Sequence, residues 1–349
     1  MAESYEVKPN RSAFLTWDTI KSGAIGFVVL AIISSILSIA TTKSYFYLFG
    51  LATFILIVLV AYTFRLIRYN KERYVFFPDK VFHKSGSIFS DAETELVVRN
   101  VTHVSLRLPW LENKFFGTGH ISIESAGSGV SEIRLSAVEQ PKEMYEYVQK
   151  LMQSNGFKLT QKQLIQQETP SSLGVFFESF RHLFTFVVIL FVIGVQFTPL
   201  LGKVEWSMSL PFILIGIVII LGAFVKFFFK YLDLKMRVYN IYDDTITYSE
   251  GFLSKNYSFI PIENLADASL KQTLIDKIFG LYDIIISCQG STQEIRFKNM
   301  VNGQKLEENV DALIQKTPTL VGKKDAKAAS MAPGGAGAAA AMAKIQAVK

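Results

Sequence analysis

The sequence predicts a membrane protein of mixed α and β structure: four transmembrane helices in two hairpins, each hairpin followed by an antiparallel β-barrel or sandwich with a C-terminal helix. The chain of 349 residues is 50 % apolar and 19 % charged, whereas soluble domains carry about 25 % charged residues. Its apolar residues gather in four long stretches, and the whole pattern occurs twice along the chain. Between these stretches, apolar side chains alternate with polar ones as in strands.

The four apolar stretches are each about 19–20 residues long and nearly free of charge, enough to cross a hydrocarbon core of about 30 Å as a helix. A polar segment of 21 residues precedes the first stretch, and only TTKS separates it from the second. We therefore expect no cleaved signal peptide. The predicted spans are Ser22–Ala40, Tyr45–Phe64, Leu183–Leu201 and Leu210–Phe229.

Basic residues are concentrated where each hairpin ends, whereas the connections inside the hairpins carry only Lys43, and Lys203 with Glu205. Because Lys and Arg accumulate in cytoplasmic flanks, both hairpins should point outward. The N-terminus, the polar domains and the C-terminus are then cytoplasmic. The predicted juxtamembrane anchors are Arg65, Arg68, Arg73, Lys226, Lys230, Lys235 and Arg237.

An internal repeat with a period of about 163 residues relates the two halves of the chain. Matched residues keep their order, and most are glycines or alternating apolar residues, which indicates one shared fold. The repeat motif consists of Gly86, Phe116, Gly117 and Arg134 in the first copy and of Gly251, Phe279, Gly280 and Arg296 in the second.

Each copy predicts about seven short strands followed by one helix. YVFFPDKVFHKSG and VYNIYDDTITYSEG each indicate strand, turn, strand and glycine turn, with Gly86 and Gly251 at positive φ. HISIES and DIIISC predict later strands, which precede the two EIR strands. Pro141 should begin the first closing helix as its N1 residue, and QKLEENVDALI should form the second.

The glycine after the second strand, the phrases FFGTGHISIESAGSG and IFGLYDIIISCQGS, the final helix and the preceding hairpin resemble the bacterial pleckstrin-homology (PH) membrane protein family in a tandem, two-module form. The resemblance covers about residues 20–316. It implies PH-like domains on the cytoplasmic side of a bacterial inner (plasma) membrane. It implies binding rather than a shared activity, because one fold serves many functions.

The composition divides the chain into seven segments. Around the spans, amphipathic stretches at 12–20 and 171–183 suit interfacial helices, or alternatively extensions of the spans into the headgroups. The segments are a leader (1–21), hairpin 1 (22–64), PH-like domain 1 (65–153), a linker with an interfacial helix (154–182), hairpin 2 (183–229), PH-like domain 2 (230–316) and a disordered Ala/Gly-rich tail (317–349).

Motifs for catalysis or cofactor binding are missing from the sequence. It contains no HExxH, GxSxG or GxxxxGK[ST], its four histidines lack ligand spacing, and Cys288 is the only cysteine. We expect no enzyme activity, catalytic residue, metal or cofactor. Nucleic acid is not an expected partner, because the basic residues lie beside the spans and in the tail.

A membrane-anchored scaffold or interaction protein that can self-assemble is the function that the sequence favours. The alternative is lipid binding or sensing, but residues 74–153 and 238–316 carry net charges of −2 and −4, which an anionic leaflet repels. The expected partners are the lipid bilayer and a protein or a second copy of the chain; a specific lipid headgroup is less favoured.

The continuous apolar run in DIIISC predicts a strand buried on both faces, and hence a contact with another module or protomer. The candidate interaction residues are Ile284, Ile285 and Ile286. Alternatively, Ile285 is one scattered apolar residue of the surface.

Overall fold

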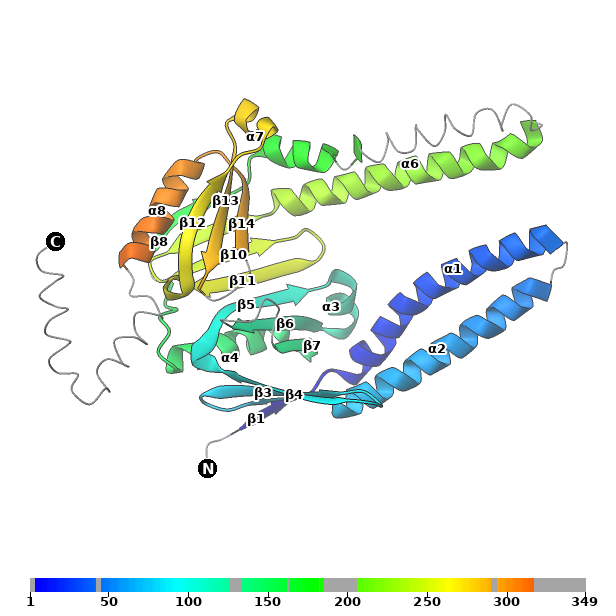
Figure 1. The fold of residues 1–349 in the computed structure, drawn as a ribbon, viewed down its shortest axis with the longest axis horizontal. Coiled ribbons are helices and arrows are strands. Elements are labelled where there is room, and N and C mark those ends of the chain that lie inside the picture. Colours follow the sequence, from blue (N-terminus) through cyan, green and yellow to red (C-terminus); the bar gives the residue numbers. More distant parts are fainter. Residues whose placement is uncertain are drawn as a thin grey trace, which may run out of the picture. The chain divides into compact units, whose positions relative to one another are not determined.

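The computed structural model divides the chain into two compact units, residues 1–159 with 254–258 and residues 160–253 with 259–349 (Figure 1). It describes residues 4–41, 45–125, 133–161, 163–181, 183–184, 206–289 and 294–316. Most of the predicted third span, the predicted tail (317–349) and the AGSG and QGS turns lie largely or wholly outside these residues.

The first unit contains two antiparallel sheets. One has the order β1-β2-β3-β4, and in the other β6 lies between β5 and β7. The strands are β1 (Tyr5–Val7), β2 (Arg73–Phe76), β3 (Lys80–Gly86), β4 (Asp91–Val97), β5 (Val101–Leu108), β6 (Thr118–Ser125) and β7 (Ile133–Glu139). The helices are η2 (Val98–Asn100), α3 (Trp110–Phe116) and α4 (Pro141–Ser154).

The two sheets of the first unit enclose a core that α4 closes. Tyr74 of β2 is fully buried and reaches β7, where its hydroxyl lies 2.9 Å from the Arg134 carbonyl oxygen. Pro141 begins α4 as predicted, and Met144 and Val148 are among the residues that α4 buries. Proline suits this position, because the first amide of a helix has no intrahelical acceptor.

The second unit repeats this arrangement. Its sheets have the orders β8-β9-β10-β11 and β12-β13-β14. The strands are β8 (Leu164–Glu168), β9 (Val238–Tyr242), β10 (Thr245–Glu250), β11 (Lys255–Pro261), β12 (Leu265–Lys271), β13 (Tyr282–Cys288) and β14 (Glu294–Met300), with η3 (Ile262–Asn264), α7 (Leu274–Phe279) and α8 (Gly303–Lys316). Residues 255–258 of β11 are the part of this sheet that is counted above with the first unit. Leu306 and Val310 of α8 pack into its hydrophobic core.

Three long apolar helices belong to the predicted hairpins: α1 (Asp18–Thr41), α2 (Tyr45–Lys71) and α6 (Trp206–Lys235). Helices α1 and α2 pack together, with the rings of Phe27 and Phe54 5.3 Å apart. Within the described residues, α2 is the one helix whose length and apolar character suit a membrane crossing, with a mean hydropathy of 2.2 and 6 % of its apolar window buried. The structure thus supports one of the four predicted spans.

The segments before the hairpins contribute strands that the sequence did not predict. Strand β1 comes from the predicted leader and pairs with β2, and β8 comes from the predicted linker and pairs with β9. With three and five residues, both strands are too short for alternation to stand out. The sequence also did not predict α3, which lies between β5 and β6, or α7, which lies between β12 and β13.

Two predictions about local structure are corrected. Gly251 has φ +103°, but Gly86 does not have a positive φ; it lies at the end of β3 opposite Asp91. Strand β13 is not buried on both faces: Ile284 and Ile286 are fully buried, whereas Ile285 is half-buried. This alternation is that of an antiparallel sheet with one face on the core and the other partly open.

Candidate functional site

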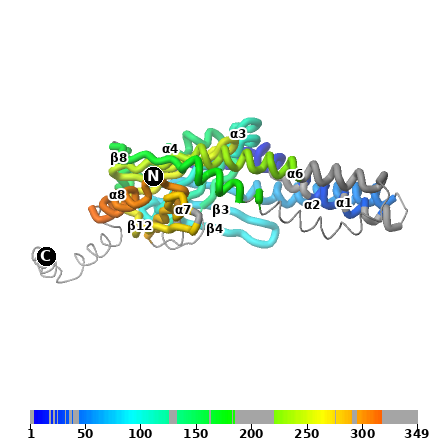
Figure 2. Tube along the Cα trace, turned by 90° about the horizontal axis from the view of Figure 1, so that it is seen from above, coloured from blue at the N-terminus to red at the C-terminus, as the bar shows by residue number. Residues whose placement is uncertain are grey.

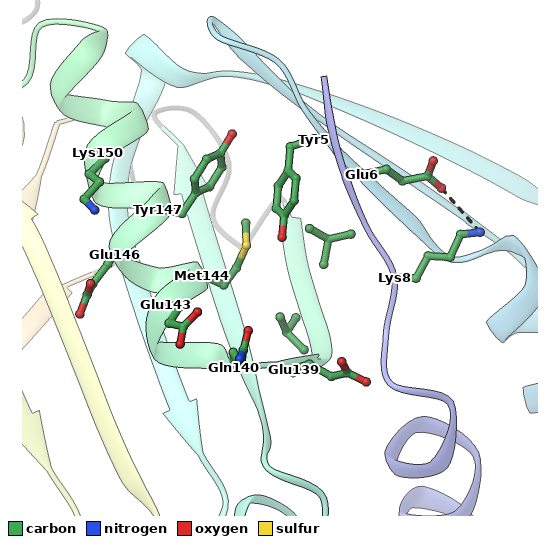
Figure 3. A pocket seen from close by; sticks show the side chains of 12 residues that line it. Tyr5, Glu6, Lys8, Glu139, Gln140, Glu143, Met144, Glu146, Tyr147 and Lys150 are labelled. Atoms are coloured by element: carbon green, nitrogen blue, oxygen red, sulfur yellow. Dashed lines mark ion pairs between the residues drawn. The ribbon is translucent and has the colours of Figure 1, made fainter. Parts of the chain in front are cut away.

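A groove of about 610 Å³ opens on the first unit between β1, the end of β7 and α4 (Figure 3). Residues from three separate parts of the chain meet there: the N-terminal segment, the β7–α4 turn and the outer face of α4. The lining residues are Tyr5, Glu6, Val7, Lys8, Val138, Glu139, Gln140, Glu143, Met144, Glu146, Tyr147 and Lys150.

Carboxylates outnumber basic groups in this groove, with four glutamates against two lysines. Glu6 is engaged by Lys8 at 3.7 Å, and Glu139 accepts a hydrogen bond of 2.7 Å from Asn10 Nδ2. Glu143 and Glu146 lie one turn apart on α4. The groove therefore favours a cationic ligand over a phosphate.

Aromatic and apolar surface completes the groove. The ring of Tyr147 on α4 lies 5.3 Å from the ring of Tyr5 on β1, as Figure 3 shows. Burial, and secondarily Tyr5, raises the pKa of Tyr147 above its ordinary value. A ligand with both an apolar side chain and a basic group would match this lining.

One edge of β1 is open to an added strand. In the described part of the chain β1 is the last strand of its sheet and pairs with β2 alone. An unpaired edge presents backbone N–H and C=O groups that can bind an extended peptide. Residues 5–8 line the groove, so the edge and the acidic lining belong to one surface.

The chain that enters the first hairpin is bonded to its own domain. The Asn10 amide donates a hydrogen bond of 2.8 Å to the Ala137 carbonyl oxygen of β7. The Asn10 side-chain oxygen accepts from the Ala13 amide at 2.9 Å and so caps the π-helical turn η1 (Ala13–Trp17). Phe14 and Leu15 are buried, so this stretch packs on protein, in contrast to the expected interfacial helix.

The second hairpin is entered in the same way. The Ser171 amide donates to the Asn299 carbonyl oxygen of β14 at 2.9 Å, and the helix at 172–181 follows. Its Glu178 accepts from Lys298 Nζ at 3.0 Å and from Asn299 Nδ2 at 2.9 Å. Burial alone would raise the pKa of Glu178, but these two donors hold it below its usual value.

At the end of the first hairpin, a buried glutamate links α2 to the sheet. Glu72 lies 2.7 Å from Nε2 of His83 on β3 and 2.9 Å from the Tyr74 hydroxyl, and Arg68 is 3.5 Å away. Burial would raise the pKa of Glu72, but these partners lower it. In the second copy of the repeat, the position of Glu72 is held by Arg237, which pairs with Glu250 at 2.8 Å. A basic residue thus replaces the acidic one at this position.

The repeat motif Phe-Gly has a structural role in both units. Gly117 ends α3 and Gly280 ends α7 in the left-handed conformation, with φ of +65° and +63°. The phenylalanine before each glycine packs on the helix that enters the hairpin. Phe116 lies 6.5 Å from Trp17, and Phe279 stacks on Phe177 at 4.6 Å between ring centres.

The sequence model of the family described as "Bacterial PH domain" matches residues 13–152 and again residues 185–314. The chain belongs to this family. It holds two tandem PH domains, which confirms the resemblance seen in the sequence. No curated protein and no solved structure matched the chain.

Several of the predicted basic anchors make contacts within the PH domains and hairpins. Arg65 donates to Thr19 Oγ1 at 2.8 Å, Arg73 lies 3.6 Å from Glu6, and Lys235 lies over the ring of Tyr231. These contacts give the basic residues a structural role in addition to the predicted role in topology.

Of the three candidate interaction residues, Ile285 alone is accessible to a partner. Ile284 and Ile286 face the core of the second PH domain and are closed to a partner. Ile285 pairs with Ser269 and Arg296 on the neighbouring strands and points to the other face of β13. A protein contact through Ile285 stays a prediction.

Three histidines of the first PH domain each lie beside a glutamate. Besides the His83–Glu72 pair, His103 lies 2.9 Å from Glu124, and His120 lies 3.1 Å from Glu112. In the described residues these side chains form no group of three or more potential metal ligands.

The groove residues were not predicted from the sequence. YEVK is too short to signal a strand, and the periodicity of α4 identifies only its buried face.

Proposed function

We propose that this protein is a non-enzymatic scaffold that anchors two cytoplasmic PH domains to a bacterial inner membrane and can self-assemble. Support for anchoring comes from the exposed apolar helix α2 and from the length and composition of the other three predicted stretches. In this proposal all four stretches span the bilayer and both hairpins point outward.

The groove of the first PH domain is the proposed binding site for a partner. The observation that carries this proposal is the open edge of β1 beside an acidic lining. An extended, basic segment would pair with β1 through its backbone and place a basic side chain near Glu143 and Glu146. Backbone pairing would supply affinity, and the carboxylates would supply specificity.

Site-specific photo-crosslinking in native membranes tests this site. A photoreactive amino acid at Lys8 should give a discrete protein adduct that Glu143→Lys with Glu146→Lys abolishes. The matched control carries the same probe at Glu95, an exposed position on β4 outside the groove. Equal labelling at Lys8 and Glu95, or adducts that survive the charge reversal, would refute the groove as the partner site.

Recognition of a phosphorylated headgroup is the alternative. Its candidate residues, Lys80 and Lys84, lie 3.2 Å from Glu95 and 2.7 Å from Glu93. Each lysine is thus already paired with a carboxylate, which weakens its attraction for phosphate. Salt-sensitive binding of the detergent-solubilised chain to anionic vesicles, lost in Lys80→Ala with Lys84→Ala, would favour this alternative.

A further inference from the structure

Each PH domain carries exposed apolar side chains on two elements beside its hairpin. In the first unit these are the β3–β4 loop and α3, and in the second the β10–β11 loop and α7. Their exposed fractions are 46 % for Ile88, 90 % for Phe89, 43 % for Trp110, 68 % for Phe115, 37 % for Phe252, 81 % for Leu274 and 75 % for Ile278. Water-exposed side chains of this size require an explanation when the two copies share them.

The β3–β4 loop lies beside the end of the first hairpin. Lys71, the last residue of α2, donates to the Ser87 carbonyl oxygen at 2.8 Å and pairs with Asp91 at 2.6 Å. Strand β2 begins just after α2 ends, and its first residue, Arg73, pairs with Lys84 near the end of β3. Strand β3 therefore runs back toward the first helical hairpin. Figures 1 and 2 show the β3–β4 hairpin projecting along the base of α2.

The position of the loop can be compared with the predicted membrane boundary. Ile88 and Phe89 form the tip of the β3–β4 turn, which the Ser87 amide closes with a hydrogen bond of 2.7 Å to the Ser90 carbonyl oxygen. Phe89 therefore lies beside the last turn of α2, about 10 Å along the helix from Phe64, where the predicted span ends.

The second unit places its loop in the same way. The Phe252 amide donates to Asp233 Oδ1 of α6 at 2.6 Å. The ring of Phe252 lies 6.4 Å from the ring of Phe229, the last residue of the predicted fourth span. This loop is thus in contact with the membrane boundary that the sequence predicts.

Helices α3 and α7 lie beside the other end of each hairpin, where the chain enters it. Phe116 and Phe279 pack on the entering helices, whereas the residues just before them, Phe115 and Ile278, point outward. Lys114 lies 5.6 Å from the centre of the Trp110 ring, and this combination of an aromatic ring with a lysine is typical of membrane interfaces.

We propose that these loops and helices insert into the cytoplasmic interface of the bilayer and dock each PH domain on the membrane from which its hairpin emerges. The ligand is the lipid surface itself, held by apolar insertion and not by recognition of a phosphate. Net negative domains can dock in this way, because apolar burial does not depend on an anionic leaflet. This proposal rests on the membrane anchoring proposed above.

The test uses the full chain in phosphatidylcholine proteoliposomes. The environment-sensitive fluorophore NBD is attached at Phe89→Cys, Phe115→Cys and Ile278→Cys, and native Cys288 is buried, so the unsubstituted chain serves as the labelling blank. The matched control is Val97→Cys, which is exposed on β4 but pairs with Lys80 at the opposite end of the β3–β4 hairpin. Lipids with a quencher near the headgroup are then added to the vesicles.

Insertion predicts a loss of fluorescence at the three test positions and none at Val97, unchanged by high salt. Quenching that needs anionic lipid or disappears in salt would overturn apolar insertion in favour of headgroup binding. Extraction of the vesicles at alkaline pH tests membrane anchoring separately from docking of the PH domains. A chain that resists extraction but is not quenched refutes docking alone, whereas an extracted chain refutes membrane anchoring and docking together.

Discussion

The backbone amide of Ser171 donates a hydrogen bond of 2.9 Å to the carbonyl oxygen of Asn299. The first unit has the same bond between Asn10 and Ala137, and both acceptor residues have a positive φ, +59° and +50°. A non-glycine residue in this region is uncommon, so its occurrence at matched places indicates a shared structural requirement. The bond ties the chain entering each hairpin to the last strand of the PH domain that follows.

Gly174→Ala should weaken this connection in the second unit. A Cβ at Gly174 would lie 2.6 Å from the Cβ of Asn299, so the entering helix must shift away from β14. We expect a loss of about 1–3 kcal/mol in the free energy of unfolding, as for other overpacked sites. Thermal unfolding in detergent measures it.

The control for that variant is Gly222→Ala, because a Cβ at Gly222 of α6 would meet nothing within 4 Å. It should unfold at the wild-type temperature or slightly above it, since alanine favours helix. Equal unfolding temperatures for the two variants would contradict the close packing of Gly174 on Asn299.

Gly251→Ala should destabilise the second unit more than Gly86→Ala destabilises the first. Gly251 has φ +103°, which costs a residue with a side chain about 1–3 kcal/mol. A Cβ at Gly86 would meet the side-chain ends of Lys71 and Asp91, which can move. Chemical denaturation of the two variants compares them, and an equal or larger effect at Gly86 would contradict this ranking.

Glu72 should make the first unit sensitive to acid. Its pKa is lowered in the folded state, so its contribution to stability is present above its unfolded pKa of about 4.3 and is lost as pH falls through the folded value. Glu72→Gln should lower the unfolding temperature at pH 7, and the difference from wild type should shrink in acid. The control is Glu93→Gln, whose carboxylate is exposed. A difference that does not change with pH would rule out this linkage.

The predicted topology places the hairpin connection outside and the PH domains inside. Tyr45→Cys, exposed at the start of α2, should react with a membrane-impermeant maleimide in intact cells, and Glu95→Cys, exposed on β4, should react after lysis alone. Buried Cys288 sets the background labelling. Labelling of Glu95→Cys in intact cells would reverse the assigned orientation.

Much of each PH domain could be predicted because its signals are local. Alternation along the β2–β3 and β9–β10 pairs, the N1 proline of α4 and the periodic apolar faces of α4 and α8 each depend on residues close in the chain. The repeat then allowed weak signals in one copy to support those in the other. The comparison with the family confirmed this level of organisation.

The sequence by itself determined the two tandem PH domains, their strand–turn patterns and the four apolar stretches, because local periodicity and composition carry these features. Only the tertiary structure decided that residues 5–7 and 164–168 complete the sheets, that Asn10 and Ser171 bond to Ala137 and Asn299, and that Ile284 and Ile286 face the core. Each of these depends on residues more than sixty positions apart or on the position of a strand within its sheet. No local pattern encodes such contacts, since they arise when the folded backbone brings strand edges together.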